Sequence, residues 1–407
     1  MPELYTLDDL DLGSLKGRRV FVRVDFNVPV SESGDVLDAT RLEEAIPTID
    51  ELARAGCKVL LASHAGRPKG QRDPRYTLRH AATKLVELLA PYRHPVRFAN
   101  DCVGEEVEKI AREMDPGEVL LLENLRFHPG EEKNDPAFAD RLAALAEAYV
   151  DDAFGSAHRA HASVVGVPER LPQKAAGRLL TREVEALGRL LGEPERPFVA
   201  LLGGAKIEGK IDTLLNLLPR LDALLLGGGM ANTFLAAQGH DVGASLYEPD
   251  RLDMARDILE KARAQGIEVL LPTDVVVADS LDAPDTARTV PVDAIPPDGK
   301  ALDFGPETRK AFAEAIGRAK TLFWNGPLGV FEKPPFDAGT RAVAEALANC
   351  PGFSVIGGGE TVAAAAQAGV TDRIGHVSTG GGASLEFLAG HELPGVKVLE
   401  RSPETDR

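Results

Sequence analysis

Short apolar runs alternate with segments of helical periodicity along the chain. The runs suit strands that are buried on both faces, and the segments between them suit helices that cover a sheet. The runs lie at residues 20–24, 58–61, 119–122 and 149–150 in the first half, and at 198–202, 223–226, 268–271, 321–324 and 353–356 in the second. This alternation predicts an α/β fold of two doubly wound, Rossmann-like lobes, each built on a parallel sheet.

A connector is predicted between the lobes. Residues 181–191 have the pattern of an amphipathic helix, which glycine and prolines end at 192–197. An ordinary surface helix of one lobe is the alternative interpretation of this segment. A chain of 407 residues fits two or three domains at roughly 150 residues each. We expect a first lobe at 1–177, an interdomain helix and linker at 178–196, a second lobe at 197–393, and a C-terminal segment, 394–407, that packs back on the first lobe.

Charge and cysteine usage narrow the functional classes. A net charge of -17 argues against a nucleic-acid or membrane surface, so any anionic ligand must be held by a locally basic site. Cys57, Cys102 and Cys350 are far apart and match neither a disulfide framework nor a zinc-binding spacing. Residues 1–9 lack the features of a signal peptide, and no apolar run reaches the ~18 residues of a membrane span. We expect a cytoplasmic protein.

Polar and basic side chains follow the strands of the first lobe. Arg23, Asp25 and Asn27 alternate at the end of the first strand and are expected to share one face. Further arginines follow later strands, at Arg67, Arg126 and Arg159. Because ligands of open α/β sheets bind at the carboxyl ends of strands, these guanidinium groups should converge on a small polyanion. Each one alone is more commonly a surface salt bridge. We expect His158 and His161, one helical turn apart, to be structural, because no third metal ligand stands at a set spacing.

Glycine-rich turns follow the strands of the second lobe. Residues 204–210 fit the first seven positions of a phosphate loop, but Ile211 replaces the hydroxyl residue that would bind magnesium. Taken alone, this match could equally be a tight turn with solvated lysines. Glycine triplets at 227–229, 357–359 and 380–382 can also turn backbone N–H groups toward an anion. Together the turns predict a bound nucleotide. The absence of a G-x-G-x-x-G motif disfavours a dehydrogenase.

In order along the chain, these motifs resemble the phosphoglycerate kinase family. The resemblance covers essentially the whole chain and is carried by residues 23–29, 63–68, 123–127, 153–161, 203–210, 227–231, 324–332 and 379–385. It implies reversible transfer of the acyl phosphate of 1,3-bisphosphoglycerate to ADP, which gives 3-phosphoglycerate and magnesium-ATP. It also implies a monomer that acts in glycolysis and gluconeogenesis.

The resemblance further implies roles for individual residues. The phosphoglycerate would be held by Asp25, Asn27, Arg41, His64, Arg67, Arg126 and Arg159. The nucleotide would be held by Gly203, Gly204, Ala205, Lys206, Lys210, Gly228, Gly305, Asn325, Pro327, Leu328, Glu332, Gly358, Gly359, Glu360 and Thr361. The catalytic residues would be Arg41, Lys206 and Gly381. Glu360 stands where the family generally has aspartate, the carboxylate that helps to hold Mg²⁺ with the nucleotide. The longer side chain leaves open whether it binds the metal directly or through water.

The predicted reaction needs no general base, and the sequence shows no motif that would supply one. The acceptor is a phosphate oxygen or a carboxylate, so no general base is required, and the sequence shows no catalytic triad or paired carboxylates that would supply one. Since the two substrates bind to different lobes, we expect hinge closure before in-line transfer, with joints at 178–197 and 393–395. Two alternatives are another acyl-phosphate-forming kinase and a non-catalytic phosphoanion-binding scaffold. A scaffold would be expected to have lost Arg41 or Lys206, and both remain.

Overall fold

The computed structural model describes residues 2–402, so residues 403–407 of the predicted C-terminal segment lie outside the described part. The chain divides into two compact units. One contains the residues up to Glu185 and resumes at Glu392, and the other runs from Ala186 to His391. The division falls inside helix α5 (Arg178–Leu191), within the segment for which we expected a connector. The expected boundaries at 177 and 197 remain a prediction.

The first unit is built on a six-stranded parallel sheet in the order β3-β4-β2-β1-β5-β6. Its strands are β1 (Arg19–Arg23), β2 (Lys58–Ala62), β3 (Val96–Phe98), β4 (Val119–Leu121), β5 (Ala148–Asp151) and β6 (Gln173–Ala176). The sequence analysis missed β3 and β6. Both are short edge strands with polar residues, so neither has the continuous apolar run that marks a strand buried on both faces.

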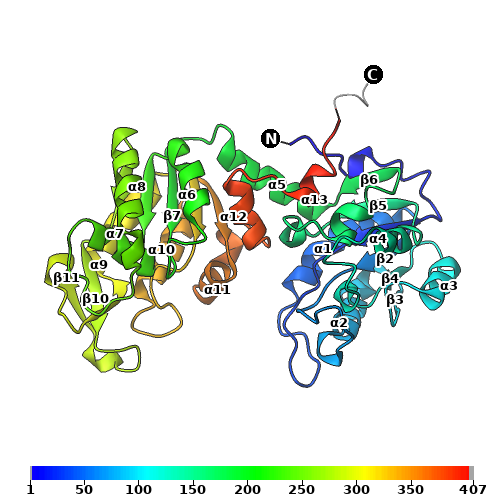
Figure 1. Cartoon of the computed structure of the whole chain (residues 1–407), viewed down its shortest axis with the longest axis horizontal. Coiled ribbons are helices and arrows are strands. Elements are labelled where there is room, and N and C mark those ends of the chain that lie inside the picture. Colours follow the sequence, from blue (N-terminus) through cyan, green and yellow to red (C-terminus); the bar gives the residue numbers. More distant parts are fainter. Residues whose placement is uncertain (1, 403–407) are drawn as a thin grey trace. The chain divides into compact units, whose positions relative to one another are not determined.

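Amphipathic helices pack on this sheet. They are α1 (Thr40–Arg54), α2 (Arg79–Leu89), α3 (Glu105–Glu113) and α4 (Pro136–Ala143) (Figure 1). In α1, the residues Leu42, Ala45, Ile49 and Leu52 recur at helical spacing, and all four are buried in one core with Val20 and the other inward residues of the sheet. The 3.6-residue period of the apolar positions therefore fixes which face of the helix meets the strands.

The second unit repeats this plan with the order β15-β14-β13-β7-β8-β9, again all parallel. The strands are β7 (Phe198–Leu202), β8 (Ala223–Leu226), β9 (Glu268–Leu270), β13 (Thr321–Asn325), β14 (Phe353–Gly357) and β15 (His376–Val377). The helices are α6 (Ile211–Leu217), α7 (Gly228–Ala237), α8 (Leu252–Ala264), α9 (Pro306–Arg318), α10 (Ala338–Asn349), α11 (Gly359–Gln367) and α12 (Gly382–Leu388). The predicted α/β class with two parallel-sheet lobes is thus confirmed.

The second unit also contains a small antiparallel sheet that was not predicted. It has the order β11-β10-β12, with β10 (Asp274–Ala278), β11 (Arg288–Pro291) and β12 (Lys300–Phe304) (Figure 1). The residues of β11 are mostly exposed, and β12 begins exposed and ends buried, so neither carries a continuous apolar run. This sheet forms part of a cavity wall described below.

The described C-terminal segment packs on the first unit. Helix α13 (Pro394–Lys397) begins beside residue 157, and the backbone N–H of Gly395 donates to the carbonyl of Ala157 at 2.8 Å. Farther on, Leu4 and Glu400 form an antiparallel bridge. Among residues 2–402, no helix combines the length and the apolar character that a membrane span requires.

Each parallel sheet changes its direction of growth once. In the first unit the change lies between β1 and β5, and in the second it lies between β7 and β13. Loops that leave the carboxyl ends of two such strands diverge to opposite faces and leave a crevice between them, which is where open α/β sheets bind ligands. The turns singled out from the sequence leave these four strands or their neighbours.

The buried carboxyl group of Asp152 holds the start of α5. Its Oδ1 accepts from the backbone N–H groups of Leu179 (2.9 Å) and Leu180 (3.2 Å). Its Oδ2 has no hydrogen-bond partner within the described chain. Burial raises the pKa of Asp152 from its ordinary 3.8 to about 7. Because the folded state holds this proton more tightly than the unfolded state, the carboxyl contributes stability that is fully present below its unfolded pKa and is lost as the pH rises through 7.

Replacing Asp152 should therefore have two separable effects. Asp152→Ala should lower the free energy of unfolding by about 1–3 kcal/mol, because two buried N–H groups lose their acceptor. Asp152→Asn keeps an acceptor but cannot ionise, so its stability relative to the parent should improve between about pH 4 and about pH 7, by no more than about 1.4 kcal/mol per pH unit. Urea unfolding across this range provides the measurement. The exposed Asp115→Asn serves as control, and a difference between Asp152→Asn and the parent that is flat with pH would contradict the assignment.

Candidate active site

Arg41 organises the polar residues that follow β1. From the first turn of α1, its Nη1 donates to Asp25 Oδ1 at 3.1 Å and to the backbone carbonyl of Asn27 at 2.9 Å. Asn27 Oδ1 in turn accepts from the backbone N–H of Gly66 at 3.0 Å. Strand β1 ends at Arg23, so the expected strand alternation does not extend to Asp25 and Asn27. Contacts with Arg41 and with the turn after β2 position these two residues instead.

Arg126 presents a buried guanidinium with unused donor capacity. It lies in a single 3₁₀ turn, Leu125–Phe127, after β4, and its Nη1 donates to the Gly66 carbonyl at 3.0 Å. Its Nε has no hydrogen-bond partner among residues 2–402, although Glu132 Oε1 is 3.9 Å away. Burial lowers the pKa of Arg126 from its ordinary value, with a further lowering from the charges of Arg23 and Arg159. A buried cation with an unfilled donor is well suited to an anionic ligand.

His64 is held as a neutral imidazole. Burial, and then the charges of Arg23 and Arg126, lower the pKa of His64 well below its ordinary value. The fully buried Arg23 places its Nη2 3.1 Å from His64 Nδ1. Since a guanidinium can only donate, Nδ1 must accept, and the imidazole proton stays on Nε2. His64 can therefore donate one hydrogen bond from Nε2 without adding charge.

His161 belongs to the same basic cluster, which the sequence analysis did not predict. Burial lowers its pKa to about 4, helped by the charges of Arg126, Arg23 and Arg159. Its Nδ1 lacks a hydrogen-bond partner in the described part of the chain. The expectation of a purely structural role rested on the metal-ligand spacing alone. The position of His161 in the H-R-A-H segment, two residues from Arg159, could have placed it near the other arginines.

The remaining predicted residues of this cluster are exposed. Arg67 follows Gly66, which contacts both Asn27 and Arg126, and Arg159 is close enough to Arg126 and His161 to affect the pKa of each. The first unit therefore brings together the predicted residues Asp25, Asn27, Arg41, His64, Arg67, Arg126 and Arg159. The arrangement is a basic edge at the carboxyl ends of β1, β2, β4 and β5.

The second unit contains a cavity of about 800 Å³ at the carboxyl ends of β7 and β13. Predicted residues that line it are Gly204, Ala205, Gly228, Pro327, Leu328, Glu332 and Glu360. It is also lined by residues that the sequence analysis missed, among them Asn232, Ser245, Lys300 and Asp303. Lys300 and Asp303 belong to β12, whose sheet was not predicted, so no signal connected them with the glycine-rich turns.

The turns after β7 and β13 touch each other through their backbones. The N–H of Gly204 donates to the Pro327 carbonyl at 2.7 Å, and a Cβ at position 203 would lie 2.3 Å from the same oxygen. Gly228 has a φ of +67°, and a Cβ there would lie 2.7 Å from the Gly204 carbonyl. Only glycine tolerates such contacts and this backbone conformation. These glycines let three chain segments meet in one wall of the cavity.

The other predicted nucleotide residues do not line the cavity. They are Gly203, Lys206, Lys210, Gly305, Asn325, Gly358, Gly359 and Thr361. Asn325 Nδ2 donates to the Gly357 carbonyl at 2.8 Å, and Thr361 Oγ1 accepts from the Gly326 N–H at 2.7 Å, so both fix neighbouring turns. At Gly305, a Cβ would lie 2.2 Å from Asp274 Oδ2, which explains this glycine by packing. Gly381, with a φ of +50°, precedes α12.

The two lysines of the 203–210 turn differ in environment. Lys206 is exposed. Lys210 folds back, and its Nζ donates to the Gly203 carbonyl at 2.6 Å and lies 3.4 Å from the Asn325 carbonyl. Burial lowers the pKa of Lys210 from 10.5 to about 8, and the charge of Glu360 opposes this shift in part. The partners of the Lys210 ammonium group in the 203–210 turn are thus backbone carbonyls, and among the described residues Glu360 is the one carboxylate whose charge affects its pKa.

Comparisons with known proteins identify similar chains of one family. The family model for phosphoglycerate kinase matches residues 7–391. The phosphoglycerate kinase of Desulforudis audaxviator is 55% identical over 395 residues, which cover 97% of this chain and 98% of that protein. That of Thermus thermophilus is 55% identical over 399 residues, covering 98% and 100%. The solved phosphoglycerate kinase of Coxiella burnetii superposes with a TM-score of 0.87 at 40% identity and covers 97% of this chain and 98% of its own.

The lowered pKa of Lys210 predicts a pH-dependent nucleotide affinity. Phosphate oxygens favour the charged lysine, so ADP binding above about pH 8 should take up a proton, and affinity should fall as the pH rises, by at most about tenfold per pH unit. Calorimetry of ADP binding in two buffers of different ionisation enthalpy would measure this uptake. Lys210→Met should abolish it, whereas the exposed Lys261→Met should not. Equal heats in both buffers for the parent protein would contradict the role of Lys210.

Proposed function

The chain belongs to the phosphoglycerate kinase family, and on this premise we propose how its residues divide the work of the reaction. The enzyme is a glycolytic phosphotransferase that moves the acyl phosphate of 1,3-bisphosphoglycerate to ADP and works reversibly. The match of the family over nearly the whole chain carries this conclusion. Nothing supports another acyl-phosphate-forming kinase or a non-catalytic scaffold.

The basic cluster of the first unit binds the phosphoglycerate in our proposal. The ligands are Asp25, Asn27, Arg41, His64, Arg67, Arg126 and Arg159, and we add His161. The unfilled Nε of Arg126 and the Nε2 proton of His64 support this assignment, because each is a donor that phosphate or carboxylate oxygens can satisfy. Because the pKa values of His64 and His161 are lowered, both histidines are neutral and the arginines provide the positive charge of the site.

The cavity of the second unit binds the nucleotide. Its apolar wall at Pro327 and Leu328 suits the base, and the glycine turn at Gly203, Gly204 and Ala205 suits the phosphates, which backbone N–H groups can approach without a side chain in the way. Lys206 and Lys210 supply positive charge beside that turn. The remaining proposed contacts are Gly228, Gly305, Asn325, Glu332, Gly358, Gly359, Glu360 and Thr361.

Glu360 is the proposed magnesium ligand. Its exposed carboxylate lines the cavity in the first turn of α11, and its charge reaches Lys210. Mg²⁺ requires oxygen ligands and in nucleotide sites keeps several waters, so one carboxylate together with phosphate oxygens is a sufficient donor set. The residues present therefore fit the ion. When bound, Mg²⁺ neutralises charge on the nucleotide's phosphate oxygens.

Catalysis in this proposal is positioning and charge stabilisation. Arg41 and Lys206 stabilise the oxygens of the transferring phosphoryl group, and the backbone N–H of Gly381 assists. Arg41 is already oriented by Asp25 and Asn27, so little reorganisation is needed at the moment of transfer. Since each unit carries one substrate, we also propose hinge closure, with joints at 178–197 and 393–395 between lobes at 1–177 and 197–393. We further propose that the enzyme is a cytoplasmic monomer.

A substitution of Arg41 tests the catalytic assignment. Arg41→Met should lower kcat by at least ~100-fold, because a charge stabiliser of the transition state is lost. The assay couples 3-phosphoglycerate and magnesium-ATP to reduction of the acyl phosphate formed. Arg54→Met changes an exposed arginine at the other end of α1 and should leave kcat unaltered. Thermal unfolding controls for folding. An Arg41→Met enzyme with near-parental kcat would remove Arg41 from the mechanism.

The magnesium assignment is tested at Glu360. Glu360→Ala should raise the Mg²⁺ concentration required for half-maximal rate, lower kcat and weaken magnesium-ADP binding in calorimetry. Glu360→Asp should retain substantial activity, since a water or a small shift of the turn can accommodate a difference of one methylene. Glu345→Ala, an exposed glutamate on α10, is the control. If Glu360→Ala follows the parental Mg²⁺ titration, Glu360 does not contact the metal.

A further inference from the structure

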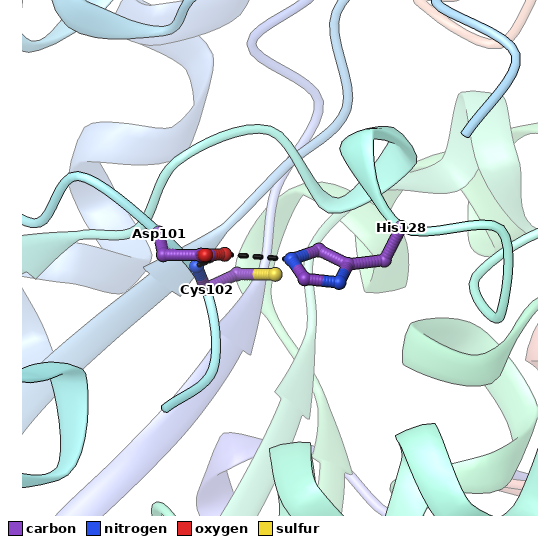
Figure 2. A group of neighbouring side chains, drawn as sticks. All are labelled: Asp101, Cys102 and His128. Atoms are coloured by element: carbon purple, nitrogen blue, oxygen red, sulfur yellow. Dashed lines mark hydrogen bonds and ion pairs between the residues drawn. The ribbon is translucent and has the colours of Figure 1, made fainter. Parts of the chain in front are cut away.

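A second group of potential metal ligands lies in the first unit, apart from the residues assigned above. Asp101 and Cys102 follow β3, and His128 follows the turn that carries Arg126. One carboxylate oxygen, the thiol sulfur and one imidazole nitrogen of these residues all lie within 4.8 Å of one another. Figure 2 shows the Asp101 carboxylate and the Cys102 sulfur both directed toward the same edge of the His128 ring.

We propose that Asp101, Cys102 and His128 bind a divalent transition-metal ion of the zinc type. Sulfur, imidazole nitrogen and carboxylate oxygen are the three donor types that Zn²⁺ accepts, and three protein ligands leave one tetrahedral position for water. Mg²⁺ prefers oxygen donors alone and would not select this group. The proposed site is therefore distinct in chemistry from the magnesium ligand Glu360.

The surroundings already orient the three side chains. The backbone N–H of Cys102 donates to Asp101 Oδ1 at 2.7 Å, and the His128 ring stacks on Phe138 with centroids 5.2 Å apart. Cys102 is fully buried, whereas the side chains of Asp101 and His128 are 37% and 27% exposed. An ion could thus enter from the carboxylate and imidazole side and reach a thiol that solvent does not otherwise contact. Outer contacts of this kind hold metal ligands in place.

Binding requires small changes in the cluster. His128 Nε2 and Asp101 Oδ1 form a hydrogen bond of 2.6 Å, whereas ligands of a tetrahedral Zn²⁺ would be separated by about 3.5 Å. The metal would replace this hydrogen bond, so the pair must open while the thiol moves closer. Burial, followed by the charges of Asp101 and Glu131, raises the pKa of the Cys102 thiol well above its ordinary value. The thiol is therefore protonated before binding, and its proton must leave to solvent as the metal–sulfur bond forms.

One cation competes with the proposed ion. Arg72 Nη2 lies 3.4 Å from Asp101 Oδ2 and also donates to the Asn100 carbonyl at 2.8 Å. The Arg72 side chain is 54% exposed, so it can withdraw into solvent when a metal binds. Its removal should strengthen metal binding, because the carboxylate would lose a competing partner. A variant without Arg72 that binds the metal more tightly would indicate a cation site, because general damage to the fold would weaken binding instead.

The test uses the full-length, reduced protein without nucleotide. Calorimetry with Zn²⁺ should detect one site per chain, and Co²⁺ should give a thiolate-to-metal charge-transfer band in the near ultraviolet. Cys102→Ala should abolish the band and weaken Zn²⁺ binding by more than the roughly 10- to 100-fold typical of losing an outer partner. Cys57→Ala, which removes a buried thiol outside the cluster, should change neither. Arg72→Gln should bind Zn²⁺ more tightly than the parent.

Asp101→Asn and His128→Gln keep the test decisive if Cys102→Ala fails to fold, because both alter partly exposed side chains. Each should weaken Zn²⁺ binding and shift or remove the Co²⁺ band. The proposal would be overturned by the absence of a thiolate band in the parent protein. It would equally be overturned if Zn²⁺ bound to Cys102→Ala or His128→Gln as tightly as to Cys57→Ala.

Discussion

The parallel pairing of the central strands is the constraint on which both candidate sites depend. Each strand of a parallel sheet ends at the same edge as its neighbours, so loops distant in sequence leave the sheet together. In the first unit this lets the backbone of Gly66 form hydrogen bonds with the side chains of both Asn27 and Arg126. In the second it places the turns after β7 and β13 in backbone contact. Both sites therefore form only when the strands are paired, because the residues that meet there are far apart in the sequence.

Burial then decides which groups at these edges carry charge. Near Arg23 and Arg126, desolvation keeps His64 and His161 neutral, so the histidines contribute directed hydrogen bonds and the arginines contribute charge. In the second unit, burial brings Lys210 closer to losing its proton, while Lys206 remains exposed. Phosphoryl transfer needs positioned donors and cations more than proton transfer. The environments of Arg41, Arg126 and Lys210 fit that need, since hydrogen bonds within the protein already orient these side chains.

Elements with a periodic or local sequence pattern were predicted correctly. The central strands have continuous apolar runs, so β1, β2, β7, β8 and β13 and the α/β class were predicted. Short polar strands such as β3 and β11 lack that signal and were not predicted. Strand β12 was not predicted either, so the residues that it contributes to the cavity were missed. Contacts between residues that only the tertiary fold brings together were not predicted either. Cys102 showed no metal-binding spacing, since its partner His128 arrives from the loop after another strand.

The acidity of the whole chain does not conflict with two polyanionic substrates. The net charge of -17 is spread over a large surface, and at physiological salt exposed charges are screened beyond about 8 Å. Within the basic cluster, Arg41 and Arg126 are partly or largely buried, where screening is weaker and each charge counts for more. Net charge therefore affects the rate of encounter more than the bound state. In the proposed sites, the few guanidinium and ammonium groups that the strand ends bring together would act on a bound phosphate at close range, whatever the sum over the rest of the chain.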